Sequence, residues 1–172
     1  MTTTVIRPAR TADLGAIDRL LGALAHSLGT PRAYAGDLEA LRKHGFGKQR
    51  LFRTLLAVGD GIEVGLCVYF PEFSTWRCRP GAYVQDLFVA DGWRGNRIGC
   101  RLLGAAARHA GDAWGARYLR LAVHTGNRGG SAFYRASGFT VDSDSRAMML
   151  TGDAFVALAR RKENDTRLRE SP

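Results

Sequence analysis

The chain has 172 residues, of which 45% are hydrophobic and 24% are charged. This composition suits one compact domain with a hydrophobic core and excludes an intrinsically disordered protein. Lysine and arginine outnumber aspartate and glutamate by 25 to 16, and the resulting net charge of +9 favours an anionic partner, either nucleic acid or a nucleotide cofactor.

The sequence carries no sign of a membrane, secretory or metal-binding protein. No run of about 18 apolar residues occurs, and the first residues lack the basic and apolar regions of a secretory signal. Three cysteines, Cys67, Cys78 and Cys100, lie far apart and show no metal-ligand spacing. We therefore expect free thiols, a cytoplasmic location, no membrane partner and no metal.

The first third of the chain predicts one strand and two helices. Residues 3–8 form the expected strand, and Thr11 or Asp13 is the expected cap of a helix with apolar residues at helical spacing. The Gly-Thr-Pro run at residues 29–31 ends this helix. A second amphipathic helix is expected over residues 35–44.

The middle of the chain predicts a β-hairpin. Two β-rich segments, residues 51–58 and 62–70, flank an Asp-Gly turn, which is a strong hairpin signal. Residues 71–80 are then expected as a loop with exposed aromatic side chains, and residues 82–89 as the next strand. The aromatic residues of this loop are Phe73 and Trp76.

The last part alternates helices with strands. The expected elements are a polar loop over 91–97, a helix over 98–114, a strand over 116–123, a helix over 131–137 ended by Gly138, and strands over 139–141 and 147–151. This order predicts a mixed α/β domain over residues 1–160 with partly parallel strands. A polar tail over 161–172 follows it.

A strand that runs through a glycine-containing loop into a helix is the most informative segment. The first turn of a helix leaves backbone N–H groups without partners, and these groups bind phosphate. Gly95 and Gly99 allow close approach of a diphosphate, while Arg94, Arg97 and Arg101 add positive charge. The nucleoside-triphosphatase and dinucleotide-binding patterns are both absent. A glycine-rich connector with scattered arginines is the alternative.

Two motifs in this order resemble the GNAT N-acetyltransferase superfamily. Its acetyl-CoA signature is Arg/Gln-x-x-Gly-x-Gly/Ala, which Arg94 and Gly99 match, whereas Arg97 stands where the first glycine belongs. Downstream, Asn127 and Tyr134 resemble the family's cofactor-side helix. Taken alone, the asparagine is a helix cap and the tyrosine a core residue. The resemblance spans roughly residues 5–150.

The resemblance implies a single-domain GNAT-like fold and acetyl transfer from acetyl-CoA to an amine. The implied fold is a mixed, central β-sheet that is splayed between its fourth and fifth strands, residues 82–89 and 116–123, and flanked by helices on both faces. Acetyl-CoA then inserts at the splay, and fixed main-chain donors there stabilise the developing oxyanion. The implied cofactor-binding residues are Leu87, Phe88, Val89, Arg94, Gly95, Asn96, Arg97, Ile98, Gly99, Cys100, Arg101 and Asn127.

The resemblance also implies catalytic roles in a direct attack within a ternary complex. Tyr134 protonates the departing thiolate, since a phenol with a pKa near ~10 keeps its proton at neutral pH. Asp86 and His124 are the candidates that take a proton from the amine. A structural carboxylate and an ordinary strand-end histidine are the alternatives for these two residues.

The acceptor is the least determined part. The stretch around Trp76 resembles the spermidine/spermine N-acetyltransferase branch, in which a glutamate precedes the strand aspartate, but here that residue is Gln85. We expect Trp76 and Gln85 to contact the acceptor, a primary amine of a polyamine, an amino acid or an amino sugar. A protein or peptide amine is the second hypothesis.

A nucleic-acid-binding module is the third hypothesis and the least favoured. It needs a contiguous basic stripe with stacking aromatics, whereas most arginines here are dispersed. We therefore expect no nucleic-acid partner. Because many relatives dimerise through sheet edges or C-terminal strands, we expect a homodimer.

Overall fold

The computed structural model describes residues 3–143 and 146–160. The chain divides into a main unit, Met1–Ser137, and a smaller unit, Gly138–Pro172. Within the described residues, no helix is long and apolar enough to cross a membrane.

A five-stranded sheet with the order β1-β2-β3-β4-β5 forms the centre of the main unit. The first four strands pair antiparallel, and β5 joins β4 in parallel. At the predicted turn between β2 and β3, Asp60 and Gly61 both adopt positive φ, +51° and +78°, as a type I′ hairpin turn requires. The strands are β1 (Thr4–Pro8), β2 (Arg53–Gly59), β3 (Ile62–Ser74), β4 (Arg79–Val89) and β5 (Leu119–Leu121).

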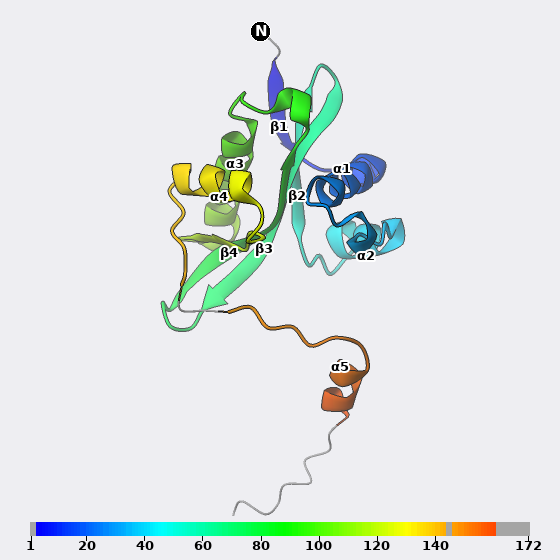
Figure 1. The fold of residues 1–172 in the computed structure, drawn as a ribbon, viewed down its shortest axis with the longest axis vertical. Helices are drawn as coiled ribbons and strands as arrows, with labels where there is room; N and C mark the ends of the chain where they lie inside the picture. Colours follow the sequence, from blue (N-terminus) through cyan, green and yellow to red (C-terminus); the bar gives the residue numbers. More distant parts are fainter. Residues whose placement is uncertain (1–2, 144–145, 161–172) are drawn as a thin grey trace, which may run out of the picture. The chain divides into compact units, whose positions relative to one another are not determined.

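Helices cover both faces of this sheet (Figure 1), as expected for the fold. On one face α1 and α2 pack, and α1 contributes Ile17 and Leu20 to a core shared with Leu56, Leu66 and Phe88 of the strands. On the other face lie α3 and α4. The helices are α1 (Leu14–Ser27), α2 (Leu38–Phe46), α3 (Ile98–Trp114) and α4 (Arg128–Ala136), with short 3-10 turns at Thr11–Asp13, Pro31–Ala33 and Asp91–Trp93.

Several element boundaries differ from the sequence prediction. The loop expected over residues 71–80 is wrong, because β3 and β4 stay paired as far as Ser74 and Arg79, which places Phe73 in β3. Pro71 is tolerated there because β2 pairs with β3 only as far as Tyr69, so the missing N–H of Pro71 faces an open edge. The strand expected over 116–123 is shorter, since β5 spans three residues.

The expected caps have different outcomes. Asn127 caps α4, and its side-chain oxygen accepts a hydrogen bond from the Gly130 N–H at 2.8 Å. Asp13 does not cap α1 with its side chain. Its carboxylate instead accepts from the Arg10 N–H at 2.7 Å and pairs with Arg7, which holds the pKa of Asp13 below its usual range.

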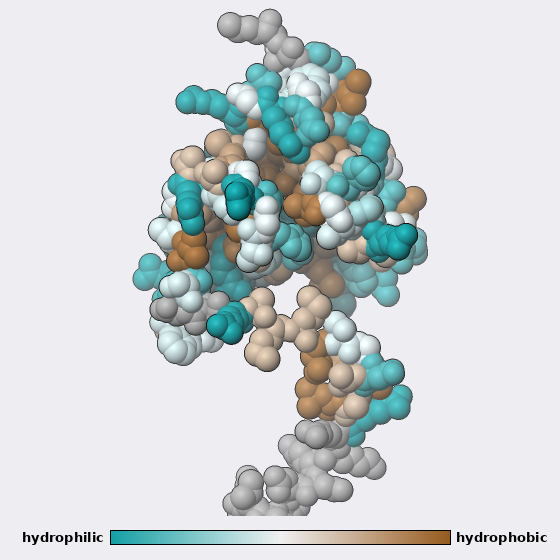
Figure 2. All heavy atoms as spheres, in the orientation of Figure 1, coloured by the Kyte–Doolittle hydropathy of each residue, from teal (hydrophilic) through white to brown (hydrophobic). Residues whose placement is uncertain are grey.

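The smaller unit corrects the expectation of two final strands. Residues 139–141 and 147–151 belong to no strand, and α5 (Gly152–Ala159) follows them. The prediction was wrong because a short apolar run becomes a strand only when a neighbour pairs with it. Apolar side chains of this unit are exposed, Met148 and Phe155 among them, and Figure 2 draws the segment in tan and brown. The predicted tail, 161–172, lies outside the described residues.

Candidate active site

The sheet opens between β4 and β5. Parallel pairing holds only from Ala82↔Leu119 to Val84↔Leu121, while β4 continues to Val89. The edge of β4 after Val84 therefore has no pairing with β5, in agreement with the splay that the family resemblance implied.

A cavity of about 560 Å³ lies at this open edge. Its lining comes from the end of β4, the first turn of α3, helix α4 and the last turns of α1. The predicted site residues in its lining are Leu87, Phe88, Val89, Arg94, Gly95, Arg97, Ile98, Gly99, Cys100, Asn127 and Tyr134.

The first turn of α3 presents free main-chain donors to the cavity. The Arg101 N–H bonds to the Arg97 carbonyl at 3.0 Å, so the N–H groups of residues 98–100 precede the first intrahelical hydrogen bond. The helix dipole adds partial positive charge at this end. Donors and dipole together make the turn suitable for a phosphate group.

Arg97 holds a backbone conformation that usually belongs to glycine. Its φ is +58° and its ψ is 13°, the left-handed region, where a Cβ costs about 1–2 kcal/mol. The position is that of the first glycine in the acetyl-CoA signature. The residue that precedes α3 therefore takes the left-handed backbone conformation even when it is an arginine instead of a glycine.

Gly99 allows a close approach between α3 and α4. A Cβ added there would lie 2.9 Å from Cζ of the Phe133 ring on α4. The absent side chain thus lets α4 close over the first turn of α3, and both helices line the cavity.

Three other polar side chains around the start of α3 make structural contacts. The Arg94 guanidinium donates from Nε to the Val89 carbonyl at 2.9 Å and pairs with Asp91 at 2.9 Å, which braces the loop against the end of β4. Asn96 and Arg101 do not line the cavity. The amide of Asn96 donates to the Trp93 carbonyl at 3.3 Å, and Arg101 donates to the Thr4 carbonyl at 2.6 Å.

Tyr134 lines the cavity, whereas Asp86 does not, although it is close enough to influence the pKa of Tyr134. Burial, with smaller contributions from the Cys67 and Asp86 side chains, raises the pKa of Tyr134 to about 12. Burial also raises the pKa of Asp86 to about 6. The phenol is therefore protonated at neutral pH, whereas the carboxylate is ionised and more basic than an ordinary aspartate.

A β-bulge at Gln85 determines where Asp86 points. Val68 pairs with Asp86 and Tyr69 pairs with Val84, so Gln85 is an extra residue on β4. Residues directly opposite share a face of the sheet, and Val68 belongs to the core beneath α1. Asp86 therefore faces the α1 side, while Gln85 is exposed.

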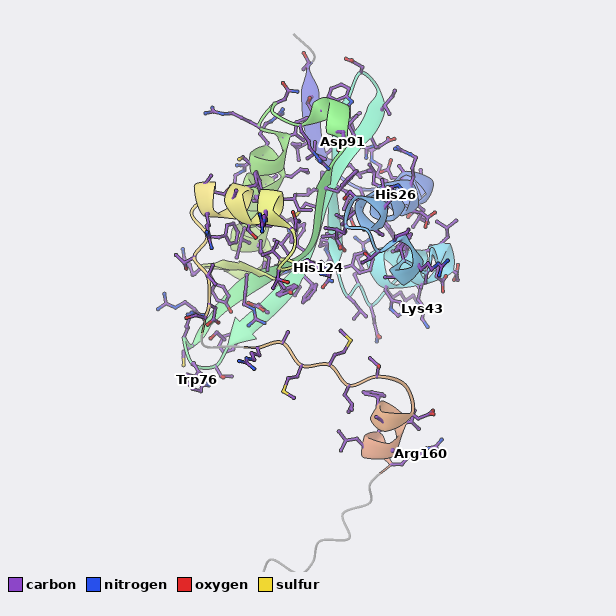
Figure 3. All side chains as sticks on the ribbon, in the orientation of Figure 1. His26, Lys43, Trp76, Asp91, His124 and Arg160 are labelled. Atoms are coloured by element: carbon purple, nitrogen blue, oxygen red, sulfur yellow. The ribbon has the colours of Figure 1, made fainter. Side chains whose placement is uncertain are left out.

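The remaining candidates lie outside the cavity lining. His124 is exposed after β5, and its carbonyl accepts from the Asn127 N–H at 2.8 Å. Trp76 is 97% exposed in the turn between β3 and β4, and Figure 3 shows it at the opposite end of the main unit from Asp91.

Sequence reasoning did not find the part of the lining that comes from α1, nor several neighbours of the predicted residues. The helical spacing of Leu24 and Leu28 predicted only core positions, and Phe133 was interpreted as a core residue next to Tyr134. The lining residues not predicted are Leu24, Ser27, Leu28, Trp93, Gly129, Gly130 and Phe133. No residue pattern signals that the end of α1 meets the splay.

Comparison with known proteins gives the family. The family model described as "Acetyltransferase (GNAT) family" matches residues 27–139. The chain belongs to the GNAT acetyltransferase family. This GNAT protein is therefore an acyltransferase, and its family uses acetyl-CoA as co-substrate.

Named relatives of this GNAT enzyme act on amines. It is 34% identical over 146 residues to the thialysine N-epsilon-acetyltransferase of Bos taurus, covering 80% of this chain and 85% of that protein. It is 29% identical over 101 residues to the L-ornithine N5-acetyltransferase NATA1 of Arabidopsis thaliana, covering 59% of this chain and 44% of that protein. Among solved structures, the integron cassette protein VCH_CASS6 of V. cholerae has the same fold, with a TM-score of 0.74, 18% identity and coverage of 91% of this chain and 98% of that chain.

Proposed function

We propose that this enzyme transfers acetyl from acetyl-CoA to the terminal primary amine of a small amino acid. The amino-acid acceptor is supported by the relatives named as thialysine and L-ornithine acetyltransferases, and acetyl-CoA binding is supported by one structural observation. The open edge of β4, the first turn of α3 and the Tyr134 side chain line one cavity. The cavity therefore has a strand edge that can pair with an extended ligand, a helix turn that can bind phosphate and a buried phenol that can donate a proton.

The residues of the cavity fit the chemistry of acetyl-CoA. The N–H groups of residues 98–100 bind the diphosphate, with Arg97 adding positive charge. Main-chain groups of Leu87 and Val89 pair with the pantetheine arm as an added strand does. Asn127 uses its side-chain oxygen for the α4 cap, which leaves its amide nitrogen as the donor toward that arm.

Acetyl transfer then needs two proton movements. The neutral amine attacks the thioester carbonyl carbon, the C–N bond forms and the C–S bond breaks. Asp86 accepts the proton that the amine loses, directly or through water, and Tyr134 donates its proton to the sulfur that leaves. Burial supports both roles, since it keeps Tyr134 protonated and makes Asp86 a better base. His124 is the second candidate for the base.

A panel assay tests the acceptor class. Release of free thiol from acetyl-CoA is followed with L-ornithine, thialysine, polyamines, an aminoglycoside and a lysine-containing peptide, and each product is identified by mass. We expect terminal acetylation of the amino acids. Turnover with the peptide alone would establish a protein acetyltransferase instead.

We also propose a cytoplasmic homodimer. Free cysteines at positions 67, 78 and 100 support a reducing compartment. Exposed apolar side chains in the smaller unit, such as Met148 and Phe155, support burial against a second copy. Light scattering on the purified full chain tests this, and a monomer at micromolar concentration would contradict it.

A further inference from the structure

A compact group of polar and aromatic side chains lies on the sheet beside the β3–β4 hairpin, outside the cavity lining. We call it the hairpin-face cluster. The Arg120 guanidinium lies over the Tyr83 ring, 5.5 Å from its centroid, and its Nε is 3.8 Å from Oε2 of Glu72. The Tyr118 ring covers Gly81 so closely that a Cβ has no room there. The members are Glu72, Tyr83, Tyr118 and Arg120.

Glu72 has unused hydrogen-bonding capacity. Its side chain is only 19% exposed. The Tyr118 hydroxyl is a hydrogen-bonding neighbour of this carboxylate, while Oε1 is buried and makes no hydrogen bond among the described residues. A buried carboxylate oxygen without a donor is costly. An ammonium group placed beside it removes that cost. Arg120, by contrast, is 65% exposed, so its guanidinium remains accessible to an anion.

The bulge at Gln85 brings this cluster onto the same face as Asp86. Phe70 pairs with Tyr83 and Val68 pairs with Asp86, and residues two apart on β3 share a face. Regular alternation along β4 would instead put Asp86 on the face opposite Tyr83. Tyr83, which pairs with Arg120, lies opposite Phe70, and Asp86 lies opposite Val68. These two positions are two residues apart on β3, which is about 7 Å along the strand.

The charges of the cluster select against a polycation. Arg120 lies beside the single carboxylate of Glu72, and Arg77 adds a second positive charge to the cluster, 5.6 Å from the centroid of the Tyr118 ring. A second ammonium group of a polyamine would face these guanidinium groups and be repelled. A zwitterion offers one ammonium to Glu72 and one carboxylate to Arg120.

We propose that the hairpin-face cluster is the specificity site that binds the α-amino and α-carboxylate groups of an amino-acid acceptor. Glu72 accepts hydrogen bonds from the α-ammonium and Arg120 donates to the α-carboxylate, while the side chain of three or four atoms carries the terminal amine to Asp86. This inference rests on the proposed function and deepens it. It distinguishes an amino acid from a polyamine or an amino sugar as acceptor.

The test compares two acceptors that differ only in the α-carboxylate, L-ornithine and 1,4-diaminobutane. Wild-type enzyme acetylates ornithine with the higher kcat/KM. In Arg120→Gln, kcat/KM for ornithine falls roughly ten- to a hundredfold, the effect of a lost hydrogen bond between charged groups, mainly through KM. The value for 1,4-diaminobutane stays the same or rises. Glu72→Gln, which keeps the shape of the side chain, lowers kcat/KM for ornithine in the same way.

Arg117→Gln is the matched control, because it removes an exposed positive charge three residues from Arg120. It leaves the ratio of the two kcat/KM values unchanged. Equal use of both acceptors by the wild type, or an equal loss for both in Arg120→Gln, overturns this inference alone. Failure to acetylate any amine, with acetyl-CoA bound, overturns the proposed function and this inference with it.

Discussion

Gly99 of α3 lies against the Phe133 ring of α4 with no space for a side chain, since a Cβ would be 2.9 Å from Cζ of that ring. This contact joins the helix that carries the phosphate-binding turn to the helix that carries Tyr134. We therefore expect the proposed cofactor binding and acid catalysis to depend on the same packing contact.

We expect Gly99→Ala to destabilise the fold by about 1–3 kcal/mol, the usual cost of overpacking. In Phe133→Ala the ring is gone, so the same Gly99→Ala change costs much less. A double-mutant cycle from urea unfolding measures this coupling, and we expect at least about 1 kcal/mol. Additive effects would show that the two residues do not share a packing contact.

Gly99→Glu adds bulk and a negative charge at the turn that presents N–H groups to the cavity. We expect calorimetry to detect no binding of coenzyme A to this variant. Ala107→Glu, an exposed position on the same helix, is the control and should bind normally. Retained affinity in Gly99→Glu would place the diphosphate elsewhere.

Tyr134→Phe removes the phenolic proton and keeps the ring. General acid catalysis contributes roughly 10²–10⁴ in rate, so we expect kcat to fall by at least about a hundredfold. Acetyl-CoA affinity, measured by calorimetry, should change little. Unchanged turnover would remove Tyr134 from the mechanism.

Asp86 should control the acid limb of the pH profile. Its pKa of about 6 predicts that kcat/KM falls as the pH drops below 6, because the base becomes protonated. Asp86→Asn should lower kcat/KM strongly and abolish that limb. A limb near pH 6 that persists in the variant would identify another base, with His124 the next residue to change.

The same residue should make stability depend on pH. The folded-state pKa is raised from 3.8 to about 6, so the folded protein binds this proton more tightly than the unfolded chain. The contribution is present below pH 4 and lost as the pH rises through 6, and it amounts to about 3 kcal/mol for a shift of this size. Relative to wild type, Asp86→Asn should therefore gain stability between pH 4 and pH 8.

Urea unfolding at several pH values measures that gain. Asp112→Asn removes a carboxylate at an exposed position of α3 and serves as the control, with no comparable trend. If Asp86→Asn parallels the wild type across this range, burial of the Asp86 carboxylate does not shift its pKa.

Arg97→Gly should raise stability by about 1 kcal/mol, because glycine adopts the left-handed conformation without strain. Arg97→Ala keeps the Cβ and loses the same charge, so it should show no such gain. Thermal unfolding of the two variants separates backbone strain from charge. Equal melting temperatures for Arg97→Gly and Arg97→Ala would show that the left-handed backbone at this position is not strained.

Features that depend on neighbouring residues in the chain, such as the bounds of a helix, could be predicted from the sequence. The bounds of α3 match the prediction, since buried Leu102, Ala106 and Ala110 recur at helical spacing and Gly115, with φ of +67°, ends the helix. The splay followed from the family resemblance. The left-handed backbone of Arg97 was unexpected because arginine gives no signal for it.

What the sequence did not predict depends on partners distant in the chain. The bulge at Gln85 depends on the register between β3 and β4, which no single residue reveals. Pro71 indicated a loop, yet it fits a strand whose other neighbour has ended. The contributions of α1 to the cavity likewise require the packing of α1 on the sheet, and the expected strands at 139–141 and 147–151 lacked pairing.

Diffraction from crystals grown with coenzyme A tests the central claim most directly. We predict density for the diphosphate within hydrogen-bond distance of the N–H groups of residues 98–100, with the pantetheine arm along Leu87–Val89 and the sulfur near Tyr134. Coenzyme A bound elsewhere, with this turn of α3 empty, would contradict the account.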